Sequence, residues 1–210
     1  MAWANSTIFS SPYKATISNE DGVCLCVYNS TTYFICFNDE QVGSIGLKFS
    51  KSTDGGSTWS TPVLIDTNGA EGLNKESMRV YGTTKVYIVY RSYVSGSGYA
   101  LRFSKSSDGG SSFSTPTTID QRDSSGGYIE NAVSLTASND YSGYLCVAYV
   151  KNPDGGSTEY IKIAYTIDVG VNWTKKTVTT TNIWSGWEAI SIKYYATNSY
   201  YVSCRTLGTN

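Results

Sequence analysis

The residue types best suited to chemistry in this sequence form three pairs of an acid and a cation. Within the pairs the residues are 15, 21 and 17 positions apart: Glu76 and Arg91, Glu130 and Lys151, Glu188 and Arg205. A carboxylate can act as a general acid or base, and a guanidinium can bind a ligand carboxylate through two parallel hydrogen bonds. The chain has no histidine, which excludes Ser-His-Asp and Cys-His catalysis and histidine-ligated zinc. Any chemistry must therefore use Asp, Glu, Lys, Arg, Tyr or Cys.

The same pairs also have a structural interpretation. Each acid precedes or begins one expected strand and each cation ends the next, so the two could form cross-strand ion pairs. Because the pattern recurs along the chain, inheritance through a repeat explains it without catalysis, and we favour this interpretation. Arg79 lies inside an expected strand and points either into a central channel or into a core pair with a neighbouring unit.

A motif repeated three times organises the elements that must position these residues. It reads Ser/Thr-x-Asp-x-Gly-x-x-aromatic and occurs at 52–59, 106–113 and 166–173, with its aspartates 54 and 60 residues apart. The recurring residues are Asp54, Gly56 and Trp59; Asp108, Gly110 and Phe113; and Asp168, Gly170 and Trp173. The carboxylate can accept backbone N–H bonds inside a hairpin turn, the glycine can take a positive φ, and the aromatic ring can pack. We interpret this turn motif as structural.

Strand-like segments surround each turn motif. One strand precedes each motif and one follows it. A further pair of strands lies upstream of each motif, at 23–28 with 33–38, at 77–81 with 86–91, and at 132–137 with 144–150. A last pair, at 189–195 and 200–204, begins a fourth unit. Four antiparallel strands per repeat are typical of a β-propeller blade. We therefore predict an all-β fold, a single β-propeller domain over residues 1–210 with about four four-stranded antiparallel blades. Their approximate bounds are 19–66, 76–120, 130–180, and 188–210 together with 1–18.

The N-terminal segment is expected to complete the last blade. Phe9-Ser10-Ser11-Pro12 matches the sequences that end the first two turn motifs, at 59–62 and 113–116. An outer strand within residues 1–18 could pair with the C-terminal strands and so remove an exposed edge. Closure within one chain, closure by oligomerisation and a fragment of a longer ring all remain open.

The amino-acid composition narrows the classes of molecule that this protein is expected to bind. Only 16% of the residues are charged, the net charge is −1, and lysines and arginines are scattered singly, which argues against a nucleic-acid binder. No apolar run is long enough for a membrane helix, and the first residues lack the features of a signal peptide. The five cysteines lie in strand-like runs and are expected to be buried thiols rather than disulfides. The turn at 152–156 lacks the spaced acids of a calcium loop, so neither a metal nor another cofactor is expected.

The three turn motifs resemble the Asp-boxes, or BNR repeats, of the sialidase (neuraminidase) superfamily, and the order of strands is similar over nearly the whole chain. The resemblance implies a propeller, which in true sialidases has six blades. Six units of this size would need about 324–360 residues, so this chain corresponds to about four. The family is mostly secreted, surface-exposed or virion-associated, and the compartment of this chain stays unassigned.

The resemblance also implies candidate catalytic residues. The segment from Trp187-Glu188 to Arg205 resembles the part of sialidases in which a glutamate assists a tyrosine nucleophile and an arginine binds the sialic acid carboxylate. The catalytic candidates are Glu188, Arg205, Arg79 and Arg91. The chain lacks an Arg-Ile-Pro sequence, and neither the nucleophilic tyrosine nor the general acid can be assigned, although Asp21, Asp39 and Asp123 lie in suitable loops.

Aromatic residues suggest a second kind of site at the blade ends opposite the turn motifs. The candidate ligand-binding residues there are Trp184, Trp187, Tyr93, Tyr128 and Glu130. Exposed Trp and Tyr rings beside polar groups can stack on sugars, although packing between blades explains them equally well. The leading hypothesis is a sialidase-like propeller that recognises glycans, including sialylated ones. The alternatives are an exo-sialidase or related glycoside hydrolase, and a structural, virion or assembly module that self-associates through open blade edges.

Overall fold

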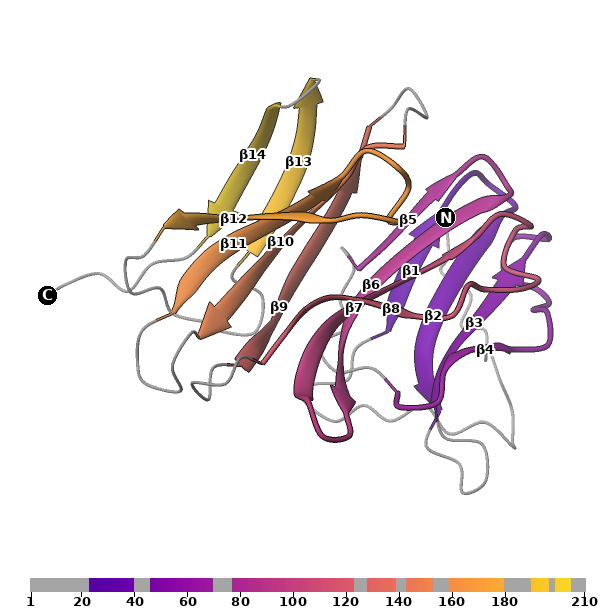
Figure 1. The fold of residues 1–210 in the computed structure, drawn as a ribbon. Coiled ribbons are helices and arrows are strands. Elements are labelled where there is room, and N and C mark those ends of the chain that lie inside the picture. Colours follow the sequence, from indigo (N-terminus) through magenta and orange to yellow (C-terminus); the bar gives the residue numbers. More distant parts are fainter. Residues whose placement is uncertain are drawn as a thin grey trace, which may run out of the picture.

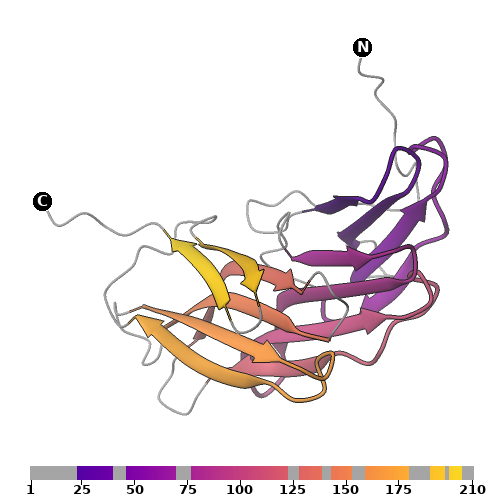
Figure 2. The ribbon, with the colours of Figure 1, turned by 90° about the horizontal axis from the view of Figure 1, so that it is seen from above.

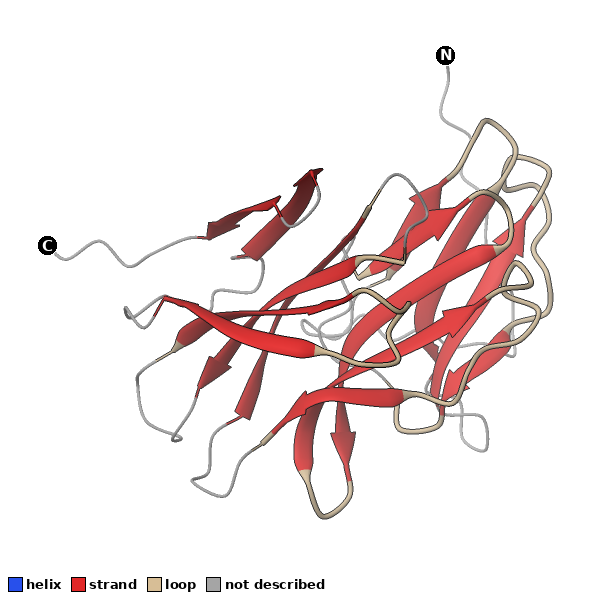
Figure 3. Ribbon diagram, turned by 45° about the horizontal axis from the view of Figure 1, so that its top comes forward, coloured by secondary structure: helices blue, strands red, loops and turns tan. Residues whose placement is uncertain are grey.

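The computed structural model describes residues 23–39, 46–69, 77–122, 128–138, 143–152, 159–179, 190–196 and 199–204, with backbone alone for 128 and 130–132. The described part consists of β-strands, turns and loops, with no helix (Figure 3). All described pairs of neighbouring strands are antiparallel. The prediction of an all-β fold is confirmed.

The strands form three four-stranded sheets and one two-stranded sheet. The N-terminal sheet contains β1 (Cys24–Val27), β2 (Tyr33–Asp39), β3 (Gly46–Ser52) and β4 (Val63–Asp66). The middle sheet contains β5 (Met78–Tyr81), β6 (Lys85–Val94), β7 (Gly98–Ser106) and β8 (Thr117–Gln121). The third sheet contains β9 (Tyr128–Ala137), β10 (Leu145–Asn152), β11 (Tyr160–Thr166) and β12 (Thr174–Thr179). The last sheet pairs β13 (Ile190–Ala196) with β14 (Ser199–Cys204). Within each sheet the spatial order follows the chain.

The sheets follow one another through their first strands, as the blades of a propeller do. β1 contacts β5, β5 contacts β9, and β9 contacts β13. The backbone N–H of Ile192 in β13 donates to Ser134 Oγ in β9 at 3.0 Å. The N-terminal sheet and the β13–β14 pair are the two ends of this row (Figures 1 and 2). The predicted fold class is confirmed, whereas the number of blades remains a prediction because residues 1–18 lie outside the described ranges.

Apolar cores fill the spaces between successive sheets. Phe34 and Phe49 of the N-terminal sheet pack with Ile88 and Tyr90 of the middle sheet. A second core joins the middle and third sheets, and a third joins β10 and β11 to β13. The middle sheet packs between two neighbouring sheets, so the central part of β6 is buried on both faces. Burial of this kind is the main favourable contribution to folding.

The cysteines are free thiols in this structure. Cys24, Cys36 and Cys146 are buried, Cys26 is half-buried, and Cys204 is exposed. Burial raises the pKa of Cys24 and of Cys146 to about 12, which keeps both thiols protonated and unreactive. The expectation of buried thiols was wrong for Cys204, because β14 is the outermost described strand of a two-stranded sheet.

Candidate functional site

The three turn motifs fold into the same hydrogen-bonded turn between the third and fourth strands of their sheets. Asp54 Oδ1 accepts a hydrogen bond from Ser52 Oγ at 2.8 Å and from the Thr58 N–H at 2.9 Å. The corresponding distances are 2.7 and 3.0 Å at Asp108, and 2.5 and 2.9 Å at Asp168. Hydrogen bonds from the hydroxyl and then the N–H of Thr58 lower the pKa of Asp54 to about 2. These carboxylates are held ionised as acceptors, which makes them unsuitable as proton donors near neutral pH.

The glycine and the aromatic ring of two turn motifs make contact across a sheet boundary. A Cβ added to Gly110 would lie 1.9 Å from the Phe49 ring, and one added to Gly170 would lie 2.2 Å from the Phe103 ring. Phe113 packs edge-to-face on Phe49 with ring centroids 5.1 Å apart, and Trp173 packs on Phe103 at 5.4 Å. Each of these turns therefore docks on the third strand of the preceding sheet.

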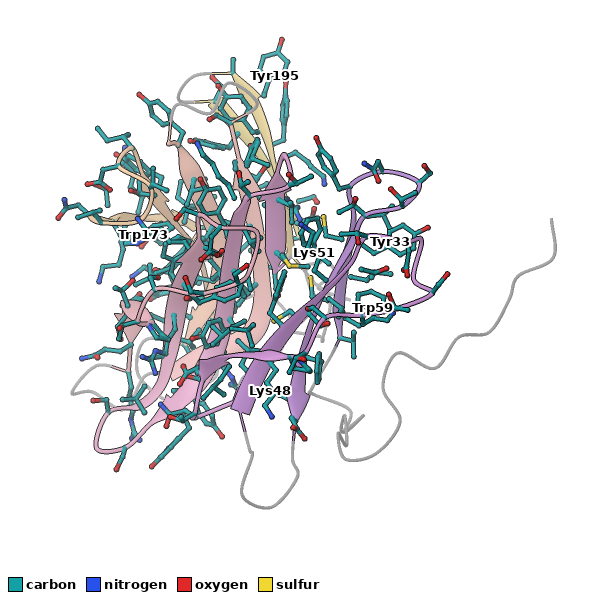
Figure 4. The ribbon with its side chains drawn as sticks, turned by 90° about the vertical axis from the view of Figure 1, so that its right-hand side faces the viewer. Tyr33, Lys48, Lys51, Trp59, Trp173 and Tyr195 are labelled. Carbon is teal, nitrogen blue, oxygen red and sulfur yellow. The ribbon has the colours of Figure 1, made fainter. Side chains whose placement is uncertain are left out.

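The first turn motif has no such partner among the described residues. The nearest atoms to a Cβ on Gly56 belong to Tyr33 of its own sheet, at 3.5 Å. Tyr33 and Trp59 lie on the same side of the molecule, and Trp173 lies on the other (Figure 4). Two of the three motifs thus position neighbouring sheets, and the candidate ligand-binding residues are predicted at the opposite ends of the blades.

At that opposite end, each third strand carries a cation four residues before the turn motif. The three cations are Lys48, Arg102 and Lys162. Arg102 Nη1 lies 3.0 Å from Asp66 Oδ2 at the end of the preceding sheet, and Lys162 Nζ lies 3.5 Å from the equivalent Asp120. Lys48 instead pairs with Asp39 of its own sheet, at 2.6 Å.

A buried tyrosine completes two of these ion pairs. Tyr90 donates its hydroxyl hydrogen to Asp66 Oδ2 at 2.8 Å, and Tyr149 donates to Asp120 Oδ2 at the same distance. We call each set of aspartate, tyrosine and cation a clasp: Asp66, Tyr90 and Arg102 in one, Asp120, Tyr149 and Lys162 in the other. Burial, followed by the charge of the aspartate, raises the pKa of both tyrosines far above the usual value. These two tyrosines stay protonated and are unsuitable as nucleophiles.

Two of the predicted site residues, Arg91 and Tyr93, come together at the end of β6. Arg91 is buried, donates from Nη1 to the carbonyl of Ile129 at 2.9 Å, and places its guanidinium 4.0 Å from the centroid of the Tyr99 ring. Tyr93 is 54% exposed and packs edge-to-face on Tyr99, with centroids 5.5 Å apart. We call Arg91, Tyr93 and Tyr99 the tyrosine platform. It stands on the β6–β7 hairpin, at the lower end of Figure 1.

Tyr99 was missed by sequence reasoning, although a signal for it exists. Residues 95–97 form the turn of the hairpin, so Tyr93 and Tyr99 are equally far from Gly96 and face each other across the two strands. A tight turn between two tyrosines predicts this cross-strand pair.

The other predicted residues are distributed as follows. Arg79 lies in β5, donates to the carbonyl of Met78 at 2.8 Å, and lowers the pKa of the Cys26 thiol, which burial raises. Asp39 is a poor general acid because it is buried in its ion pair with Lys48. Tyr128 and Glu130 belong to β9, where only the backbone is described. The remaining candidates lie outside the described residues: Glu188, Arg205, Trp184, Trp187, Asp21 and Asp123.

The described residues offer neither a metal site nor a membrane-spanning helix. They contain no group of three or more Cys, Asp, Glu or His side chains that could hold a metal ion. No helix among them is long and apolar enough to cross a membrane.

Comparison with known proteins supports the fold. No family model matches the sequence, and no curated protein matches it. An alpha-L-arabinanase of Penicillium chrysogenum, solved with arabinobiose, superposes with a TM-score of 0.61 at 16% identity over 87% of this chain and 56% of its own. An endo-arabinase of Bacteroides thetaiotaomicron gives a TM-score of 0.55 at 13% identity over 97% of this chain and 80% of its own. The chain therefore spans little more than half of the first of these structures and resembles both in fold.

Proposed function

We propose that this propeller recognises glycans at the blade ends opposite the turn motifs, with the tyrosine platform as part of the site. The observation that carries the proposal is the exposed Tyr93 ring, held edge-to-face on Tyr99 while the Arg91 guanidinium backs Tyr99 from the core. A fixed tyrosine ring presents an apolar face to the C–H groups of a sugar and a hydroxyl for hydrogen bonding. The buried Arg91 reduces the freedom of the ring beneath, so little ordering is needed on binding.

The fold adds support to a role with glycans. The arabinanase of similar fold was solved with arabinobiose, a sugar ligand. Sialylated glycans are the finer proposal, because the segment from Glu188 to Arg205 resembles the part of sialidases that binds a carboxylate. A guanidinium suits such a ligand because its planar fork matches both carboxylate oxygens.

A glycan array tests the proposal with two matched variants. Tyr93→Ala removes the exposed ring of the platform, and we expect it to abolish binding to the glycans that the unmodified protein retains. Tyr195→Ala is the control, because Tyr195 is 68% exposed and packs edge-to-face on Tyr201 at 5.3 Å, near the opposite end of the molecule (Figures 1 and 4). Equal loss in both variants, or no loss in either, would contradict a site on the platform.

The second candidate is a glycoside hydrolase, either an exo-sialidase or a related enzyme. It is favoured by the likeness to two arabinan-degrading enzymes and by the acid and cation at Glu188 and Arg205. Turnover of fluorogenic sialosides and arabinosides, abolished by Arg205→Ala, would support the enzyme. Binding without turnover, lost in Tyr93→Ala or Trp187→Ala, would leave a glycan-binding module, and absence of both would leave the assembly module.

We also propose a single domain of about four blades whose ring closes within the chain or through a second copy. The open β13–β14 sheet supports this proposal, since every other sheet has four strands among the described residues. The mass in solution separates a ring shared between copies, which gives a dimer, from the monomeric forms, which are a ring closed within the chain and a fragment of a longer ring.

A further inference from the structure

The two clasps differ in the number of cations that surround the aspartate. Among the residues that the structure describes, Asp66 pairs with one cation, Arg102, at 3.0 Å. Asp120 has three: Lys151 and Lys175 each lie 3.3 Å from Oδ1, and Lys162 lies 3.5 Å from Oδ2. Even if Lys151 is left aside, two ammonium groups share the one carboxylate that the described residues supply here, so positive charge is in excess among them.

The lysines at the second clasp also have more hydrogen-bond donors than Asp120 can accept. An ammonium group carries three donors, and hydrogen bonds between ammonium and carboxylate groups are ordinarily about 2.7–2.9 Å long. Lys48 reaches Asp39 at 2.6 Å, whereas the three lysines at Asp120 stay at 3.3–3.5 Å. Asp120 Oδ2 already accepts a hydrogen bond from Tyr149, which leaves less capacity for Lys162. Lys162 and Lys175 therefore each have donors that Asp120 does not accept and that a ligand in solvent could reach.

The two lysines lie on one face of the third sheet and are open to solvent in part. Lys162 pairs with Thr177 across β11 and β12, and Lys175 lies two residues before Thr177, so both side chains project from the same face. Their side chains are 20% and 44% exposed, whereas Asp120 is 6% exposed. A ligand could reach the ammonium groups from solvent while the carboxylate stays covered.

We propose that Lys162 and Lys175 bind a tetrahedral oxyanion, a sulfate or phosphate group, between the outer strands of the middle and third sheets. Two lysines bind such a group as point charges, and a doubly charged oxyanion offers acceptors for donors that Asp120 does not satisfy. Asp120 holds the lysine side chains in place. Burial raises the pKa of its carboxyl, but the hydrogen bond from Tyr149 and the charges of the three lysines outweigh burial, so the pKa is lowered. Among the described residues, Glu159, directly before β11, is the acidic residue nearest in sequence to Lys162. This site is independent of the tyrosine platform and of the proposed function.

Thermal unfolding at millimolar sodium sulfate, with sodium chloride at matched ionic strength, tests the site. We expect a saturable rise of Tm with sulfate in the unmodified protein, and an affinity about tenfold weaker in Lys175→Gln and weaker still in Lys162→Gln/Lys175→Gln. Lys176→Gln is the matched control, because Lys176 is the next residue of β12, faces the other side and lies over the Tyr165 ring at 5.6 Å. Lys175 is 44% exposed, so its single variant keeps the test usable if the double variant does not fold.

A second arm of the experiment identifies the source of the oxyanion. Binding of a sulfated oligosaccharide, lost on desulfation and in Lys175→Gln, would support the site and assign it to a sulfated glycan. Binding of inorganic sulfate and phosphate alone would support the site and assign it to a free anion. The absence of saturable binding, or equal responses in Lys175→Gln and Lys176→Gln, would overturn the proposal.

Discussion

The two ends of the blades differ in how strictly they repeat. At the turn end, three motifs form the same bonds, and the hydroxyl-to-carboxylate distances differ by only a few tenths of an ångström, from 2.5 to 2.8 Å. At the opposite end, the equivalent positions at the end of the second strand carry Asp39, Ser92 and Lys151. Repetition with identical geometry indicates a requirement of the fold that every blade shares. All three positions are buried, so their divergence indicates that the fold accepts different residue types there as long as each is paired or packed.

The largest effects are expected from the glycines of the turn motifs. Gly110→Ala and Gly170→Ala should each destabilise the protein by about 4 kcal/mol, or prevent folding, because the new Cβ collides with a phenylalanine ring and the φ is positive. Gly56→Ala should cost only about 1 kcal/mol, since its φ is positive but its surroundings have room. Urea unfolding midpoints measure the difference. Equal losses at all three glycines would show that the motifs do not act by docking on the preceding sheet.

The tyrosines of the clasps should give the next largest effect. Tyr90→Phe and Tyr149→Phe each remove a buried hydrogen bond to a carboxylate and should destabilise by about 2 kcal/mol. Tyr93→Phe is the control at the same end of the molecule, where the hydroxyl group belongs to an exposed side chain. Chemical denaturation compares the stability of the three variants. Equal stability would mean that the tyrosine hydroxyls of the clasps do not stabilise the packing between sheets.

The aspartates of the turn motifs should make stability depend on acid pH. The pKa of Asp54 and Asp108 falls from the ordinary 3.8 to about 2 in the folded state, and that of Asp168 also falls. A carboxyl group with a lowered pKa stabilises the fold above its unfolded pKa, and this stabilisation is lost as the pH falls through the folded value. The free energy of unfolding should therefore decrease from about pH 4 to pH 2. Asp54→Asn should make that decrease shallower, and an unchanged slope would contradict the lowered pKa.

The smallest effect on stability should come from the tyrosine platform. Tyr93→Ala removes a side chain that is 54% exposed, and we expect the unfolding free energy to change by no more than about 0.5 kcal/mol. Denaturation curves of the two proteins should nearly coincide while glycan binding is lost. A large loss of stability would place Tyr93 among the residues that the fold needs, and the contrast between the two ends would disappear.

The sequence predicted the fold more completely than the site. Turn motifs at regular spacing are local signals, because the Asp, Gly and hydroxyl residues that bond to one another are at most four positions apart. The clasps join residues 24 and 29 positions apart on different sheets, and single-sequence reasoning did not pair them. Phe37, Tyr90 and Tyr149 occupy equivalent positions, and only the two tyrosines have an aspartate at the end of a preceding described sheet. Comparison of repeats could therefore have revealed the clasps. The positions of Glu188 and Arg205 remain predictions.

The unpartnered first turn motif has a consequence for building longer rings. Gly56 and Trp59 have the residue types of a docking turn, yet among the described residues no phenylalanine of a preceding sheet receives them. At the turn end, the contact between sheets consists of a glycine with its aromatic ring on one unit and a phenylalanine on the unit before. An engineered unit placed ahead of β1 would need a phenylalanine three residues before its own turn motif, as Phe49 and Phe103 are. The same glycine-to-phenylalanine contact at two sheet boundaries makes it the part of the interface that such a unit would have to reproduce.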